Sequence, residues 1–170
     1  HSERVAIKAK NIASAMNQAY LMSHGLFDLK ELEMAALLHD VGKLGVPKHI
    51  LNYKGALSDD EWTIVRRHSV LGAEIVSKID NLRAITADIR HHHERWDGGG
   101  YPDNIDGDAI SPFVRMVSIA DVFDALTTNR PYQRAQKTFT ALSIMQTRLA
   151  ADLDPDLFLA FVDMMGHPAR

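Results

Sequence analysis

In the helices that the sequence predicts, apolar residues recur every three or four positions, and several of these stripes end in a histidine or an aspartate. Between residues 81 and 93 the stripe ends at Ile89, and His92 and His93 follow three and four positions later on the same face. His91 follows only two positions after Ile89 and turns away from that face. A helical chain with this pattern must accommodate imidazole groups on its buried side.

The same pattern recurs in four other helical segments. His68 lies among Ile64, Leu71 and Ile75, so we expect it to point into the core. Three further stripes lead to polar residues at helical spacing. Leu32 and Ala36 are followed by His39 and Asp40, and Val114 and Val117 are followed by Asp121 and Asp124. In the first segment, His1 precedes the stripe that contains Val5 and Ile12.

Buried imidazoles and carboxylates need partners, because an unpaired buried charge costs roughly several kcal/mol. A shared metal ion is one such partner, and imidazole and carboxylate are its expected ligands in a chain without cysteine. The alternative is that each group is satisfied separately, histidine by a backbone carbonyl and aspartate as a helix cap. For a single residue that alternative is simpler, but for the whole set we favour metal binding.

The length and composition predict one all-α domain that spans residues 1–170. A chain of 170 residues with 46% hydrophobic content can bury one core, and no alternating strand pattern competes with the helical ones. Ser58 and Glu61 form a capping box, and Asp154-Pro155 is a helix start. Helices are expected over 3–22, 29–41, 58–78, 81–93, 112–128, 138–149 and 155–165.

Charge and hydropathy exclude several classes of partner. The net charge is −3 and the basic residues are dispersed, so we expect no polymeric nucleic acid. No apolar run approaches the roughly 20 residues of a membrane span, so we expect no membrane contact from this segment. The absence of cysteine fits a cytoplasmic location. The chain begins at His1 without an initiator methionine, which suggests a fragment that lacks an upstream regulatory region. His1 itself is either native or the residue of a tag.

Two long irregular stretches are expected, over residues 42–57 and 94–111. The second is dense in Gly, Pro, Asp and Asn, which would suit an ordinary surface turn. Because it follows His92 and His93 directly and is long for a connection, we expect it to line a functional site.

Two motifs carry a family resemblance. HDVGK at residues 39–43 resembles the signature of the HD superfamily of metal-dependent phosphohydrolases. HHERWDGGGYP at 92–102, followed by ADVFDALTTNRPY at 120–132, resembles the HD-GYP subfamily of cyclic di-GMP phosphodiesterases, and the similarity extends almost from end to end. The resemblance implies an HD-domain bundle of about seven helices, with a GYP loop beside a buried metal site.

The resemblance also implies the roles of individual residues. The metal ligands would be His1, His39, Asp40, His68, His92, His93 and Asp121. We expect Asp40 to bridge two divalent ions, with His1, His39 and Asp121 on one side and His68, His92 and His93 on the other. The ions are expected to be iron or manganese, and a third ion is used by members with a glutamate upstream of the first histidine.

Substrate contacts follow from the same resemblance. Asp40 and Lys43 are the expected catalytic residues, and substrate would be bound by Lys43, Gly100, Tyr101, Asp124, Arg130 and Arg134. Asp124 has an alternative role behind the metal ligands. Tyr101, Trp96 and Tyr132 are candidates for stacking on a guanine, although Trp96 would equally serve to anchor its loop. Gln133 replaces a basic residue that is common in the family, which puts substrate preference in doubt.

The expected activity is hydrolysis of cyclic di-GMP to pGpG and onward to GMP, in bacterial second-messenger signalling. Two alternatives remain open. The first is a catalytically silent module that binds a cyclic dinucleotide or a protein partner. The second is a phosphodiesterase that acts on cyclic GMP-AMP; the GYP segment argues against a mononucleotide substrate.

Overall fold

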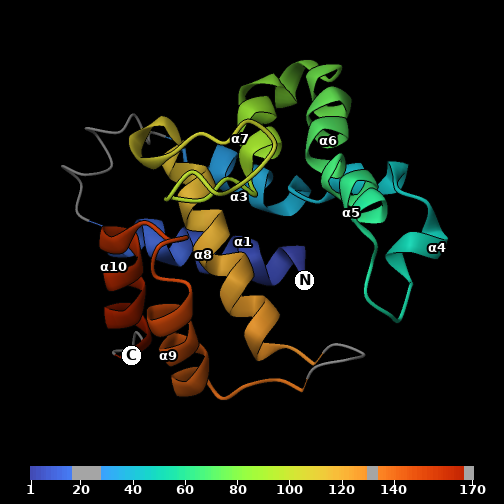
Figure 1. Cartoon of the computed structure of the whole chain (residues 1–170). Helices are drawn as coiled ribbons and strands as arrows, with labels where there is room; N and C mark the ends of the chain where they lie inside the picture. Colours follow the sequence, from blue (N-terminus) through green and yellow to red (C-terminus); the bar gives the residue numbers. More distant parts are fainter. Residues whose placement is uncertain (17–27, 130–133, 167–170) are drawn as a thin grey trace.

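The computed structural model describes residues 1–16, 28–129 and 134–166, and all secondary structure within them is helical. The prediction of an all-α fold is confirmed. Figure 1 shows helices only, with α8 crossing the centre, α6 and α7 above it and α9 and α10 below. The α-helices are α1 (Ser2–Ala15), α3 (Leu29–Leu38), α4 (Lys48–Leu51), α5 (Asp59–Arg66), α6 (His68–Ser77), α7 (Thr86–His91), α8 (Pro112–Thr127), α9 (Thr138–Arg148) and α10 (Pro155–Gly166), and the 3₁₀ helices are η1 (Val41–Gly45), η2 (Asp80–Ile85) and η3 (Gly107–Ala109).

The main core forms where α1 packs against α3, α8 and α10. Val5, Ala9 and Ile12 follow one face of α1 at helical spacing and are completely buried. On the other side of this core, the rings of Phe123 on α8 and Phe161 on α10 meet edge to face with centroids 5.1 Å apart. The stripe predicted on the first helix is therefore confirmed.

A smaller apolar cluster joins α3 to α6, η2 and α7. It consists of Ala35, Val76, Ile85 and Ile89, each at most 2% exposed. Since α3 contributes to both clusters, its C-terminal end lies between them. His39 and Asp40 follow directly after this end of α3.

Residues 58–78 form two helices, and the single helix expected there is a wrong prediction. The interruption falls at Arg67, so the apolar stripe does not continue across it. Ile64 and Ile75, expected to be buried, are 39% and 38% exposed. The buried face of α6 consists of small residues instead, Ser69, Gly72, Ala73 and Val76, together with His68.

Other boundaries differ more modestly from expectation. The segment over 81–93 is a 3₁₀ helix followed by α7, and the stretch over 42–57 contains η1 and α4. The first helix ends at Ala15, and residues 17–22 of its expected range lie outside the described part of the chain. The capping box is confirmed, because Ser58 Oγ accepts from Glu61 N–H and the Glu61 carboxylate accepts from Ser58 N–H. Among the described residues no helix has the length and apolar character needed to cross a membrane.

A buried ion pair fixes α8 against the start of α10. Arg115 Nη1 donates to Asp154 Oδ2 at 2.8 Å, and both side chains are about 5% exposed or less. The other oxygen of Asp154 accepts from the N–H groups of Asp156 and Leu157, as an N-cap does. Asp154-Pro155 is thus a helix start, as predicted, and its carboxylate is shared between capping and pairing.

Two glycines allow η1 to lie directly on α6. A Cβ placed on Gly42 would stand 1.9 Å from the backbone oxygen of His68 and 2.4 Å from the backbone nitrogen of Gly72. A Cβ on Gly72 would in turn meet Gly42 N at 3.2 Å and Ile89 Cγ2 at 2.9 Å. The contact brings the turn that carries Asp40 against the first turn of α6, which carries His68.

Gly42→Ala should therefore separate η1 from α6, because backbone atoms cannot yield as a flexible side chain does. We expect a loss of about 2–3 kcal/mol in the free energy of unfolding. That corresponds to a Tm lower by roughly 5–10 °C for a domain of this size, measurable by calorimetry. The matched control is Gly166→Ala in α10, where an added Cβ meets no atom within 4 Å. Equal Tm values for the two variants would contradict this account of the η1–α6 contact.

Candidate metal centre

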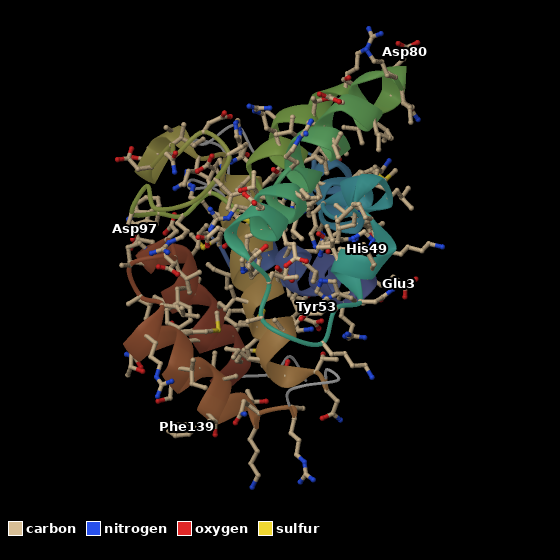
Figure 2. All side chains as sticks on the ribbon, turned by 45° about the vertical axis from the view of Figure 1, so that its right-hand side comes forward. Glu3, His49, Tyr53, Asp80, Asp97 and Phe139 are labelled. Carbon is tan, nitrogen blue, oxygen red and sulfur yellow. The ribbon has the colours of Figure 1, made fainter. Side chains whose placement is uncertain are left out.

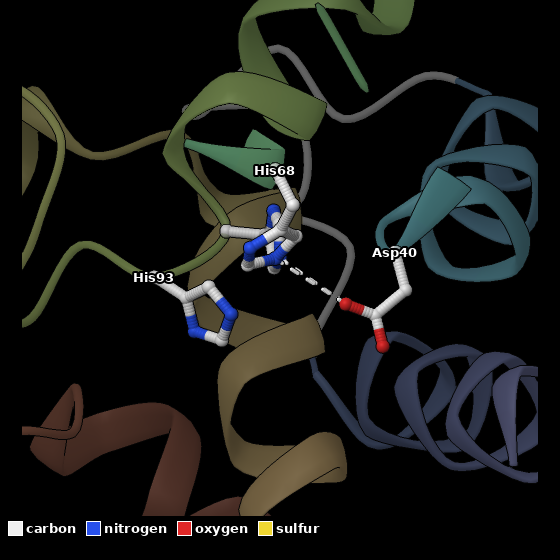
Figure 3. Close-up of side chains that lie close together, drawn as sticks. Asp40, His68 and His93 are labelled. Carbon is white, nitrogen blue, oxygen red and sulfur yellow. Dashed lines mark hydrogen bonds and ion pairs between the residues drawn. The ribbon is translucent and has the colours of Figure 1, made fainter. Parts of the chain in front are cut away.

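The predicted metal ligands come from five helices and converge at the junction of the two apolar clusters. His39 is the C-cap of α3 and Asp40 follows it; His68 is the first residue of α6. His92 and His93 follow the end of α7, His1 precedes α1, and Asp121 lies on α8. Figure 3 shows Asp40, His68 and His93 directed toward one another.

Three of the histidines are anchored in the same way. Nδ1 of His39, His68 and His92 lies 2.6, 2.6 and 2.7 Å from the backbone carbonyl oxygen three residues earlier. A carbonyl oxygen only accepts, so each Nδ1 carries the proton and donates it. In the neutral ring Nε2 then bears a lone pair and is available as a metal ligand.

Two of these lone pairs face each other. His68 Nε2 and His92 Nε2 are 3.1 Å apart, and the two side chains are only 1% and 2% exposed. Burial is the main cause that lowers the pKa of His92 well below its usual value, so a proton is disfavoured there. Asp40 Oδ1 lies 3.4 Å from His68 Nε2 and 3.9 Å from His92 Nε2. A cation bound between these atoms would remove the electrostatic repulsion between the two Nε2 lone pairs.

His93 completes this group, since one ligand atom each of Asp40, His68, His92 and His93 lies within 4.8 Å of all the others. Burial and the neighbouring His68 lower the pKa of His93 to about 3, so its ring is neutral near neutral pH. Three imidazole nitrogens and a carboxylate oxygen this close together form a suitable first coordination sphere for a first-row divalent ion.

A second group shares Asp40 with the first and contains His1 and His39. Among the described residues, Nε2 of His39 is buried without a hydrogen-bond partner, although it lies 3.4 Å from Asp40 Oδ2. Asp121 Oδ1, also buried without a hydrogen bond, lies 3.1 Å from His1 Nε2. Two donor sets that share one carboxylate fit two metal ions, and the orphaned Nε2 of His39 has no other evident partner.

Asp124 lies behind His1 and is only 1% exposed. Its carboxylate accepts from His1 Nδ1 at 2.8 Å, Arg4 Nε at 2.8 Å and Lys8 Nζ at 3.0 Å. Burial opposes ionisation, but the hydrogen bonds from Arg4, His1 and Lys8 outweigh it and lower the pKa. Asp124 therefore orients the His1 ring and is not among the residues that line the two pockets, in keeping with the alternative role behind the metal ligands; its contact with substrate stays a prediction. Arg4 and Lys8 were not predicted, although their spacing on the face of His1 was visible.

Lys43 contacts the shared ligand directly. Its Nζ lies 2.6 Å from Asp40 Oδ2, and its side chain is 42% exposed. Burial raises the pKa of Asp40, but the adjacent imidazoles of His39 and His68 and the positive charge of Lys43 together lower it far below its usual value. Asp40 is therefore a carboxylate at any physiological pH, and Lys43 places a positive charge at the rim of the site.

A pocket of about 630 Å³ opens above the candidate metal centre. Its floor includes His1, Asp40, His68, His93 and Asp121, and Lys43 and Tyr101 stand beside them. A smaller pocket of about 250 Å³ lies on the other side of His93 and Tyr101 and is lined by Arg66, Arg95 and Glu94. The ligand set is thus accessible to a molecule larger than water.

The loop over residues 94–111 lines the site, as predicted. The Tyr101 ring stacks on His93 with centroids 4.8 Å apart and planes 29° apart, and Arg66 lies over the Tyr101 ring at 5.3 Å. Gly100 permits this placement, because a Cβ there would stand 2.4 Å from Arg95 N and 2.5 Å from Glu94 Cα. The glycine before Tyr101 is thus required by close backbone packing.

Of the other residues expected to contact substrate, only some lie in the described part of the chain. Arg134 is exposed and is absent from the walls of both pockets, and Arg130 and Tyr132 lie outside the described residues. Trp96 serves as a loop anchor: its backbone N–H donates to the backbone oxygen of Asp152 at 2.9 Å, and Arg115 covers its ring at 5.3 Å. Two aromatic residues of the pocket, Tyr53 and Trp62, were not predicted, because no spacing rule links them to the ligands.

Comparison with known proteins is consistent with this geometry. The chain is 40% identical over 162 residues to 3'3'-cGAMP-specific phosphodiesterase 3 of Vibrio cholerae, covering 94% of this chain and 34% of that protein. It is 40% identical over 139 residues to a cyclic di-GMP phosphodiesterase of Pseudomonas aeruginosa, covering 81% of this chain and 33% of that protein. The chain thus spans about a third of the length of these curated relatives.

The structural neighbour and the matching family both point to an HD-domain fold. A solved HDG"Y"P protein from Bdellovibrio bacteriovorus superposes with a TM-score of 0.68 at 18% identity, covering 98% of this chain and 53% of that one, which establishes similarity of fold. The family described as HD domain matches residues 2–157. Members of this family are metal-dependent phosphohydrolases, in keeping with the His and Asp groups that could bind metal. The chain therefore belongs to the HD domain family, and its resemblance to the HD-GYP proteins is confirmed.

Proposed function

We propose that this domain is a metal-dependent phosphodiesterase that hydrolyses cyclic di-GMP to pGpG and, after rebinding of the open dinucleotide, to GMP. The observation that carries the proposal is the pair of His/Asp groups that share Asp40 at the floor of an open pocket of about 630 Å³. The relatives named cyclic di-GMP and 3'3'-cGAMP phosphodiesterases support the choice of a cyclic dinucleotide.

The proposed cofactor is a pair of divalent ions, iron or manganese, held with Asp40 between them. His68, His92 and His93 would hold one ion, and His1, His39 and Asp121 the other. When bound, such ions neutralise phosphate charge and activate water as a nucleophile near neutral pH. The pre-set Nδ1 donors keep the rings of His39, His68 and His92 aimed at the site, so little reorganisation is needed on binding.

The charged groups around the floor would orient the phosphodiester. Lys43 lies 2.6 Å from Asp40 and is partly exposed, so its ammonium group can turn from Asp40 to a nonbridging phosphate oxygen. Tyr101 stands beside His93 on the pocket wall and limits access of solvent to that side. Arg130 is proposed as a further phosphate contact on the resemblance alone. Regulation by a domain outside this chain is likewise proposed on the resemblance.

The second candidate substrate is 3'3'-cyclic GMP-AMP. It is favoured by the 40% identity over 94% of the chain to an enzyme named as specific for that compound. Identity to the Pseudomonas enzyme named for cyclic di-GMP is also 40%, so overall similarity does not separate the two. A silent cyclic-dinucleotide-binding module is the remaining alternative.

His92→Ala tests the metal centre, and the adjacent His91→Ala is its matched control. His91 turns away from the site and pairs with Asp103 at 2.8 Å, so its loss should leave metal content unchanged. His92→Ala removes one Nε2 from the buried group, and we expect loss of at least about one equivalent of metal and at least about 100-fold in turnover. Elemental analysis after anaerobic purification and chromatography of the products measure both. Full metal content with no turnover in the unmodified protein would point to the silent module.

Substrate preference is tested by kcat/KM for cyclic di-GMP, 3'3'-cyclic GMP-AMP and a cyclic mononucleotide under identical metal loading. We expect both cyclic dinucleotides to exceed the mononucleotide by at least about 100-fold, since a mononucleotide would leave much of the pocket empty. Preference for the mononucleotide would overturn the assignment of a cyclic dinucleotide.

A further inference from the structure

One wall of the larger pocket has a chemistry unlike that of its floor. It is formed by α4, the turn after it and α5, and its side chains are mainly apolar: Ile50, Leu51, Ala56, Leu57, Trp62 and Val65. The rest of the lining carries imidazoles, carboxylates, Lys43 and Tyr101. A ligand that fills this pocket must therefore combine an anionic part with a flat or apolar part.

Two aromatic rings on this wall are left largely uncovered. Tyr53 is 54% exposed and Trp62 is 47% exposed, and in the described part of the chain neither stacks on another aromatic ring. Large aromatic side chains bury most of their surface when they serve only to stabilise a fold. Their exposure at a pocket that also holds ligand-binding groups indicates a surface for a ligand.

Gly55 shapes the position of the Tyr53 ring. A Cβ on Gly55 would stand 2.8 Å from Cε1 and 3.1 Å from Cζ of Tyr53, so the ring lies directly over the glycine. The turn thus holds the tyrosine at the rim although more than half of its side chain is exposed. Figure 2 shows Tyr53 beside this turn.

We propose that Tyr53 and Trp62 form a stacking surface for a purine base of the substrate, whose phosphate lies on the metal-binding floor. This inference rests on the proposed function and adds a base-binding subsite to it. The exposed ring faces and the absence of charged side chains on this wall suit a base better than a second phosphate. Stacking tolerates any base, so the subsite accepts guanine or adenine.

Tyr53→Leu should raise KM for cyclic di-GMP about tenfold while kcat changes less than about twofold, because the ring binds the base and lies away from the reacting phosphate. Tyr53→Phe keeps the ring face and should restore KM to within about twofold of the original value. Gly55→Ala should raise KM in the same direction by displacing the ring, without removing any group that binds substrate. Each constant is measured by chromatography under one metal loading.

Phe139→Leu is the matched control, because Phe139 is 83% exposed and lies on α9 away from Tyr53 (Figure 2). Its KM should equal that of the unmodified protein. A KM unchanged in Tyr53→Leu, or equally poor in Tyr53→Phe and Tyr53→Leu, would overturn the stacking role. Absence of cyclic di-GMP and cyclic GMP-AMP hydrolysis in the unmodified, metal-loaded protein would instead overturn the proposed function, so the two failures are distinguishable.

Fluorescence gives a readout independent of turnover. The chain has two tryptophans, Trp62 on this wall and Trp96 beneath Arg115. Titration with a non-hydrolysable phosphorothioate analogue of cyclic di-GMP should quench the emission of the unmodified protein and leave that of Trp62→Phe largely unchanged. Equal quenching in both proteins would overturn the placement of the base on Trp62.

Discussion

The structure depends on one repeated interaction, the hydrogen bond from a histidine Nδ1 to the backbone carbonyl three residues earlier. His39, His68 and His92 each make it at the end or beginning of a helix. The bond fixes the tautomer, so each Nε2 presents a lone pair to the same small volume. Such a set is unfavourable without a cation, because the Nε2 atoms of His68 and His92 lie only 3.1 Å apart.

Helix ends and small residues provide that packing. Asp40 follows the C-cap of α3, and Gly42 lets η1 lie on the backbone of α6 so that Asp40 reaches His68. On the opposite side, Gly100 lets the GYP loop lie on the backbone of residues 93–95, which stacks Tyr101 on His93. The glycines of both motifs therefore act through close backbone approach, and the chemistry of the site depends on them although they carry no functional group.

The larger pocket has two chemically distinct surfaces. Imidazole, carboxylate and ammonium groups form the floor, where a phosphodiester would be bound and cleaved, while Tyr53 and Trp62 stand on an apolar wall. Asp124 does not form part of these surfaces; it accepts hydrogen bonds from Arg4 and Lys8 and orients the ring of His1. The proposed substrate, a cyclic dinucleotide, also has both kinds of surface, anionic phosphates and flat purines.

The sequence by itself determined the helical class and the inward direction of His39, His92 and Asp121, because helical periodicity assigns a residue to a face regardless of its partners. His68 is buried as predicted, but the stripe from which its burial was predicted is interrupted at Arg67. It did not reveal that residues 58–78 would break at Arg67, since the exposure of Ile64 and Ile75 depends on which helices lie opposite. It also missed Tyr53 and Trp62, whose place in the pocket is a property of the turn after α4. The family resemblance named the groups expected to share Asp40, but only the tertiary structure decided how close together they lie, because distances between helices arise from packing and are not encoded in spacing along one helix.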